Sequence, residues 1–228
     1  MSHPKRRKPT IRRAPLAAAA LLTTGAALAG FTMHSGSTAS TASALSESTQ
    51  TNAAKEYAVD IVHSNIIFKI RHSGISNFYG RFKDFQGDIR FDPRNVKGMD
   101  ISFSVETGSV DTNNRTRDGH IKNADFFNAR QYPQATFTST SIVETGSEGV
   151  YELNGDFSIH GVTQPITATI TDVSTGKQQG KDAMGFEARF SISRSDFGIT
   201  KYVDPKDPEG GPLGDKVEII VAIEAVHD

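Results

Sequence analysis

The sequence predicts an all-β fold with eight antiparallel strands, and three observations support this prediction. From Tyr57 onward, apolar residues alternate with polar ones, which is the period of a strand with one dry and one wet face. Segments rich in Gly, Pro, Asn, Asp, Ser and Thr separate the alternating runs. The helix-like part is short, at about residues 121–129, inside the longest polar connection.

Each expected strand is centred on one alternating run. The runs cover residues 66–70, 87–91, 99–105, 135–137, 151–159, 166–170, 186–192 and 217–225. Turns are expected at residues 92–95, 145–149 and 161–165, and from residue 175 onward. Eight strands can bury their apolar faces in a sandwich or in a closed barrel, and closure also removes the exposed sheet edges.

Phenylalanine dominates the positions that should face the interior. The chain has 14 Phe and no Trp, and no polar group recurs regularly among these positions. An eight-stranded barrel can be filled by its own side chains or can enclose one slender ligand, and both alternatives remain open here. The expected lining residues are Ile66, Phe68, Ile70, Phe91, Ile101, Phe103, Val105, Phe126, Phe127, Phe137, Phe157, Ile159, Phe186 and Phe190.

The first residues resemble a secretory signal. Six basic residues and no acid lie in the first 13 positions, an apolar run follows at residues 16–28, and Ala27–Ala29 forms a cleavage motif. We expect a signal peptide at 1–29, with cleavage as late as 44, a Ser/Thr/Ala-rich flexible linker at 30–55, and a folded domain at 56–228. The alternative is an uncleaved anchor, although the run is short for a spanning helix. The expected product is periplasmic or secreted, without stable membrane insertion after signal cleavage.

Composition limits the function classes. Without the six basic residues of the leader, 19 basic residues remain against 26 acidic ones, which argues against nucleic acid as a partner. The chain has no Cys, so disulfides, thiolate metal sites and Cys nucleophiles are excluded. The oligomeric state stays open, with a homodimer as one option.

Three polar clusters interrupt the alternation. They are residues 60–64 followed by His72, residues 109–125, and residues 193–198. The histidines are scattered without metal-ligand spacing and no G-x-S-x-G motif is present, so we expect no metal, no cofactor and no catalytic residues.

Acid–arginine neighbours within these clusters, Arg117/Asp118 and Arg194/Asp196, are expected to fasten loops over a barrel end. Two alternatives remain. His72, Arg117, Asp118 and His120 could meet the polar head of a bound lipid, or Asp118 and His120 could act as an acid/base pair in an enzyme.

Short motifs then give a family resemblance. They occur in order as Y-x-V-D-x-x-H-S (57–64), F-x-I-x-H-S-G (68–74), G-R-F (80–82), S-V-D-T (109–112), R-D-x-H-I (117–121), D-F-F (125–127), Y-P-x-A-T-F (132–137), G-D-F-S-I-H-G-V-T (155–163) and S-R-S-D-F-G (193–198). Together they resemble the YceI-like family of bacterial lipid-binding proteins, over essentially all of residues 57–226.

The resemblance implies a lipocalin-like, eight-stranded antiparallel barrel with a short helix in a long connection. It also implies that a polyisoprenoid or other long-chain lipid occupies an apolar tunnel, as the partner of an exported binding protein. One segment departs from the expected pattern: residues 204–212 are rich in Pro and acids, and this loop could alter access to the tunnel.

Overall fold

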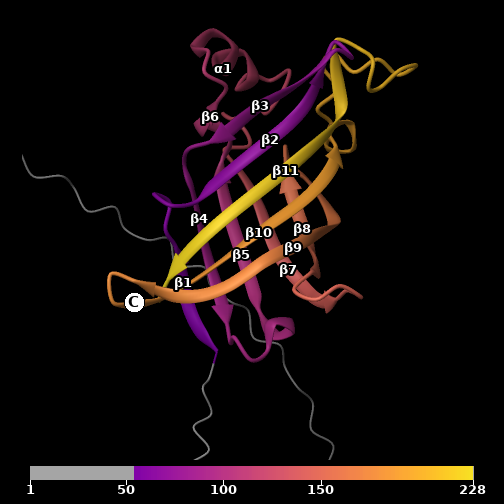
Figure 1. Cartoon of the computed structure of the whole chain (residues 1–228). Helices are drawn as coiled ribbons and strands as arrows, with labels where there is room; N and C mark the ends of the chain where they lie inside the picture. The colour runs from indigo at the N-terminus through magenta and orange to yellow at the C-terminus, as the bar shows by residue number, and fades with distance from the viewer. Residues whose placement is uncertain (1–53, 228) are drawn as a thin grey trace, which may run out of the picture. The chain divides into compact units, whose positions relative to one another are not determined.

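A computed structural model describes residues 54–227, and these form one closed antiparallel β-barrel (Figure 1). The signal peptide and nearly all of the linker expected from the sequence lie outside the described residues. Within the described part, no helix has the length and apolar character needed to cross a membrane.

The barrel wall is assigned as eleven strands. They are β1 (Lys55–Val59), β2 (Asn65–His72), β3 (Ser76–Phe82), β4 (Phe85–Phe91), β5 (Asp100–Glu106), β6 (Val110–Asp111), β7 (Gln134–Glu144), β8 (Tyr151–Ile159), β9 (Val162–Gln178), β10 (Lys181–Ser193) and β11 (Leu213–Val226). The helical segments are α1 (Arg115–Ile121) and the 3-10 turns η1 (Val96–Gly98), η2 (Thr107–Ser109) and η3 (Arg194–Phe197).

These eleven segments make up eight positions around the barrel, which confirms the predicted architecture. β1 and β2 both pair with β11, β1 also pairs with β4, and β2 with β3. β4 pairs with β5 and β3 with β6, so β1/β2, β3/β4 and β5/β6 are each one interrupted strand. The sequence did not reveal β1, β3 or β6, because they are short or place Gly80 where an inward apolar residue would mark the alternation.

Two hairpin turns are shorter than the sequence predicted. His160 and Gly161 have φ angles of 55° and 79°, and Gln179 and Gly180 have 49° and 84°. Positive φ at both central residues is typical of a two-residue type I′ turn, which matches the twist of the flanking strands. β9 therefore includes Pro165. Pro165 pairs with Asp156 on β8. The pairing of β9 with β10 covers only residues 169–178, so the missing N–H of Pro165 removes no bond to β10.

The helix also lies earlier than expected. The sequence placed it at about residues 121–129, whereas α1 ends at Ile121. Asn114 sets its start, because the Asn114 side chain accepts a hydrogen bond of 3.0 Å from the Arg117 backbone N–H. The following residues form successive turns, in which Asn128 adopts a left-handed φ of 45°.

The barrel interior is packed solid over part of its length. Ile89, Phe91, Ile170 and Ala225 are each at most 1% exposed and belong to one core cluster on β1, β4, β5 and β7–β11. In Figure 1, α1 and the loop before β11 lie at one end of the barrel and the C-terminus at the other. Phe91, which was expected to line a ligand tunnel, instead packs in this core with its ring 6.4 Å from that of Tyr57.

Candidate functional site

A cavity of about 400 Å³ lies inside the barrel, between β2, β3, β11 and the segment that contains α1. Most of its lining is apolar: Ile66, Phe68, Ile70, Phe78, Phe82, Val105, Ile121, Phe126, Phe127, Ala135, Phe157, Ile159, Pro212, Leu213, Val217 and Ile219. The exposed side chains of His72, Arg117, His120 and Tyr202 form its rim, which we call the mouth. A cavity of this size and composition lies within the usual range for small-ligand sites.

A smaller cavity of about 70 Å³ lies next to the first, and the two share Ile66, Val105, Ala135, Phe157 and Ile219 in their linings. Every lining residue expected from the sequence, except Phe91, borders one of these two cavities. The structure therefore brings these side chains together, and their contact with a ligand stays a prediction.

Three phenylalanines form a row at one level of the wall, which we call the phenylalanine belt. Phe103 on β5 is in register with Phe137 on β7, which is in register with Phe157 on β8. Phe157 also meets Phe190 on β10 edge-on, with ring centres 5.6 Å apart. The belt borders the small cavity, and its member Phe157 also borders the larger one. Phe157 therefore separates the two cavities and forms part of the floor of the larger cavity.

Glycines opposite phenylalanines leave room in the lumen. Gly80 on β3 is in register with Phe68 on β2, and a Cβ at residue 80 would lie 2.2 Å from the Phe68 ring. Gly87 is likewise in register with Phe103, at a Cβ–ring distance of 2.7 Å. Gly155 is diagonal to Phe137, at a Cβ–ring distance of 2.4 Å. The rings thus lie against the wall over glycine backbone, rather than extending across the barrel.

Arg117 is held rigidly at the mouth. Its Nε donates to Thr112 Oγ1 at 2.8 Å, and its Nη2 donates to the Thr112 carbonyl at 2.7 Å. The guanidinium carbon lies 4.4 Å from the centre of the Phe78 ring, a cation–π contact. Arg117 therefore presents a fixed positive charge beside the apolar cavity.

Asp118 and His120 have different surroundings. Asp118 accepts hydrogen bonds from the Thr112 N–H at 2.9 Å and the Thr112 hydroxyl at 2.6 Å, and it does not line the cavity. The His120 ring packs edge-on against Phe126, with centres 5.1 Å apart. Asp118 thus fastens the loop after β6, but through Thr112 and not through the expected pairing with Arg117, which also bonds to Thr112. No hydrogen bond joins the Asp118 side chain to His120 in the described structure.

The other predicted loop fastener works differently from the expectation. Arg194 does not rely on Asp196: the residue is 4% exposed, and its guanidinium donates to backbone carbonyls within residues 199–214. These are Gly214 at 2.8 Å, Ile199 at 2.9 Å, Lys201 at 2.8 Å and Leu213 at 3.0 Å. Burial lowers the pKa of Arg194. Asp215 instead accepts from the Ser195 N–H and hydroxyl, at 2.9 and 2.7 Å.

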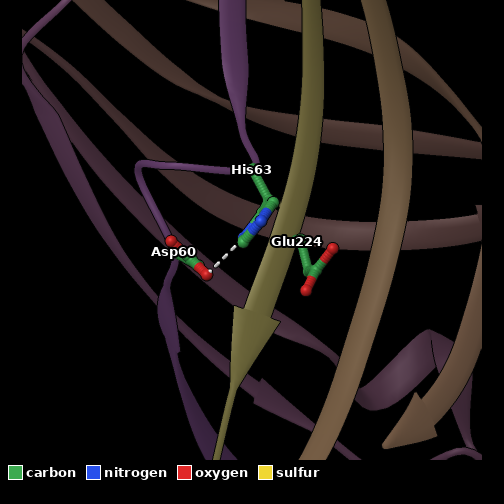
Figure 2. Close-up of side chains that lie close together, drawn as sticks. All are labelled: Asp60, His63 and Glu224. Atoms are coloured by element: carbon green, nitrogen blue, oxygen red, sulfur yellow. Dashed lines mark hydrogen bonds and ion pairs between the residues drawn. The ribbon is translucent and has the colours of Figure 1, made fainter. Parts of the chain in front are cut away.

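A second polar cluster lies at the turn between β1 and β2, away from the cavity lining. Figure 2 shows the His63 ring between Asp60 and Glu224 of β11. Each of these three residues has one potential metal-ligand atom, a ring nitrogen or a carboxylate oxygen, and these atoms lie within 4.8 Å of one another. His63 Nδ1 is 2.8 Å from an Asp60 oxygen, to which Gln178 also donates at 2.8 Å.

The bonds from Gln178 and His63 lower the pKa of Asp60 to about 2, and Asp60 raises the pKa of His63. The arrangement is an ion-pair cluster that ties the turn to β9. Sequence spacing showed Asp60 and His63 only, because Gln178 and Glu224 come from distant strands.

Comparisons with known proteins agree with this geometry. Residues 57–225 match a family model described as a YceI-like domain. A UPF0312 protein of Ectopseudomonas mendocina is 40% identical over 177 residues, which cover 76% of this chain and 88% of that protein.

Two solved structures have a similar fold. The crystal structure of Burkholderia cenocepacia BcnA is 25% identical, with a TM-score of 0.63 over 73% of this chain and 98% of that one. A polyisoprenoid binding domain from Saccharophagus degradans has a TM-score of 0.58 over 75% of this chain and 98% of that one; at 14% identity this likeness shows the fold alone.

Proposed function

Because this chain belongs to the YceI-like family, we propose that it binds a long-chain apolar lipid, a polyisoprenoid or similar amphiphile, inside its barrel. The role would be storage or transport of the lipid. The single observation that carries the proposal is the cavity of about 400 Å³, whose lining is apolar except at the mouth. The structural neighbour named as a polyisoprenoid binding domain supports the lipid class.

The energetics follow from hydrophobic transfer. Burial of each methylene group contributes about 0.8 kcal/mol, so an apolar chain gains several kcal/mol when it leaves water for a dry cavity. The packed core beyond the phenylalanine belt stabilises the fold, while the mouth end is hollow. Both alternatives from the sequence, a filled barrel and a ligand cavity, thus apply to different parts of the same interior.

The proposal contains no catalytic step. Asp118 is bonded to Thr112, and His120 packs against Phe126, so neither side chain is arranged as a partner of the other. His72, Arg117 and His120 at the mouth are left for the polar end of the lipid.

We further propose that the protein is exported to the periplasm or beyond, after removal of residues 1–29 or up to 44. The basic start, apolar run and cleavage motifs support this proposal. N-terminal sequencing of protein recovered outside the cytoplasm tests it: a terminus near residue 30 or 45 agrees, whereas an intact Met1 in the membrane fraction contradicts it. The same preparation run on a sizing column decides between monomer and homodimer.

Native mass spectrometry of the purified protein tests lipid binding. We expect an additional mass above that of the polypeptide, which disappears after organic extraction and is recovered in the extract. A bare polypeptide mass, together with no uptake of added single-chain lipids, would contradict the proposed function.

A further inference from the structure

We propose that the ligand is a single-chain amphiphile with an anionic head group, a carboxylate or a phosphate, and that Arg117 binds this head group. This inference rests on the proposed lipid binding and makes it more specific. It follows from the charges at the mouth, the free donors of Arg117 and the volume of the cavity.

The charge at the mouth has one sign. Among the side chains that line the larger cavity, Arg117 carries the one permanent charge, and no Asp, Glu or Lys is present in this lining. The imidazoles of His72 and His120, which also belong to this lining, can donate hydrogen bonds. Asp118 directs its carboxylate to Thr112 and not to the cavity. A neutral head group would not require this arrangement, whereas an anion is attracted by it.

Arg117 has hydrogen-bond donors that its bonds to Thr112 do not use. A guanidinium has five N–H groups, and the bonds to Thr112 occupy one on Nε and one on Nη2. The other three are free of these bonds, in a group whose plane is fixed by Thr112 and by the Phe78 ring. Such a pre-oriented fork is suited to two parallel hydrogen bonds with a carboxylate or phosphate.

The volume limits the tail to one chain. A methylene occupies about the same space as a water molecule, roughly 30 Å³, so the cavity of about 400 Å³ holds about 13 carbon atoms. Phe157 closes the far end of this space. A single chain with its head at Arg117 and its tail toward Phe157 is enough to fill the cavity, whereas the two tails of a phospholipid together exceed its volume.

Four probes separate the two head groups from their neutral counterparts: hexadecanoate against hexadecanol, and farnesyl phosphate against farnesol. Each is titrated into the protein, and the dissociation constants are compared within each pair. We expect the anion of at least one pair to bind about 10- to 100-fold more tightly, the range for hydrogen bonds to a charged group. The pair with the larger ratio identifies the head group as carboxylate or phosphate.

The variant Arg117→Gln should remove this preference while the neutral alcohols still bind. Arg115→Gln is the matched control, because Arg115 is exposed on the same helix and does not line the cavity. Arg117→Lys keeps the charge without the fork, and we expect an intermediate ratio.

The outcomes are distinguishable. Equal affinity for the anion and alcohol of both pairs in the wild-type protein would overturn the head-group inference, and this comparison does not depend on the folding of a variant. An unchanged anion preference in folded Arg117→Gln would overturn the role of Arg117. Failure of all four probes to bind would instead refute the proposed lipid binding itself.

Discussion

The ring of Phe68 on β2 lies directly over Gly80 on β3, so that a Cβ at position 80 would lie 2.2 Å from Phe68 Cζ. Because Gly80 has no side chain, the Phe68 ring can lie flat along the barrel wall at this position. The same relationship recurs between Gly87 and Phe103, which are also in register, whereas Gly155 makes a similar close approach to Phe137 from a diagonal position, because its register partner is Ser139. The barrel can therefore be lined with phenylalanine and still contain a cavity, because these rings lie against glycine backbone and do not extend across the interior.

Gly80→Ala should narrow the cavity. The added Cβ forces the Phe68 ring away from the wall and into the lumen, since the contact falls well below van der Waals distance. Excluding about two methylenes of the ligand weakens binding about tenfold, at about 0.8 kcal/mol each. Titration of farnesol measures the change. Gly176→Ala is the control, because this glycine of β9 has nothing within 4 Å of an added Cβ; equal affinities for both variants would refute the role of the pair.

Phe157→Ala should lengthen the accepted chain. Phe157 borders both cavities, so removal of its ring joins them. The protein should then bind chains longer than the wild type accepts. The loss of unfolding free energy should stay below the roughly 3–5 kcal/mol expected for truncating a packed Phe, because the ring already borders empty space.

Phe91→Ala is the matched control for this change. Phe91 is 1% exposed in the packed core, so its truncation should cost the full amount, roughly 3–5 kcal/mol, and leave chain-length preference unaltered. Urea unfolding gives the stabilities, and a series of fatty alcohols gives the preference. If the two variants have the same chain-length preference, Phe157 is not part of the floor of the larger cavity.

Asp118→Ala should destabilise the fold by about 1–3 kcal/mol, because the N–H and hydroxyl of buried Thr112 lose their acceptor. Denaturant unfolding measures the loss, with the exposed loop residue Glu148→Ala as a control expected to change little. A wild-type stability for Asp118→Ala, combined with a lost lipid affinity, would indicate a direct ligand contact in place of the fastening role.

The sequence predicted the number of strands correctly, because seven of the eight positions around the barrel carry a long alternating run in at least one segment and hydrophobic period is a local property. Local patterning did not locate the position of α1, which depends on the cap at Asn114 rather than on apolar spacing. It also missed β3, whose inward Gly80 hides the alternation yet shapes the cavity.

Part of the candidate site could also be predicted from the local alternation of apolar and polar residues. Inward-facing residues follow from alternation, so the lining of the cavities could be named from the sequence. Whether an inward ring borders a cavity or packs in a core depends on the level along the barrel, and Phe91 therefore could not be separated from Phe68. The partners of Arg194 are backbone carbonyls about 5 to 20 residues away, which no sequence pattern indicates.

The ion pair of Asp60 and His63 gives a defined pH dependence. The pKa of Asp60 is lowered to about 2 from 3.8, so its contribution to stability is present above pH 4 and is lost as the pH falls toward 2. The pKa of His63 is raised above 6.5, so its contribution is complete below that value and declines as the pH rises through the raised pKa.

Asp60→Asn should therefore melt at a lower temperature than the wild type at pH 5, with the difference shrinking as the pH approaches 2. Thermal melts at several pH values between 2 and 8 check this. A difference in melting temperature that stays constant from pH 5 to pH 2 would show that the Asp60 charge does not support the turn.

Photo-crosslinking tests most directly whether a lipid tail occupies the barrel. Hexadecanoate with a diazirine at its terminal carbon is bound, irradiated, and its attachment sites are mapped by peptide mass spectrometry. We expect labels on Phe157, Val105 or Ile66, which border both cavities at the floor. Labels confined to Ile67 and Ile220, which face outward from the barrel, would contradict binding in the interior. Labelling that an excess of unmodified hexadecanoate does not reduce would contradict it as well.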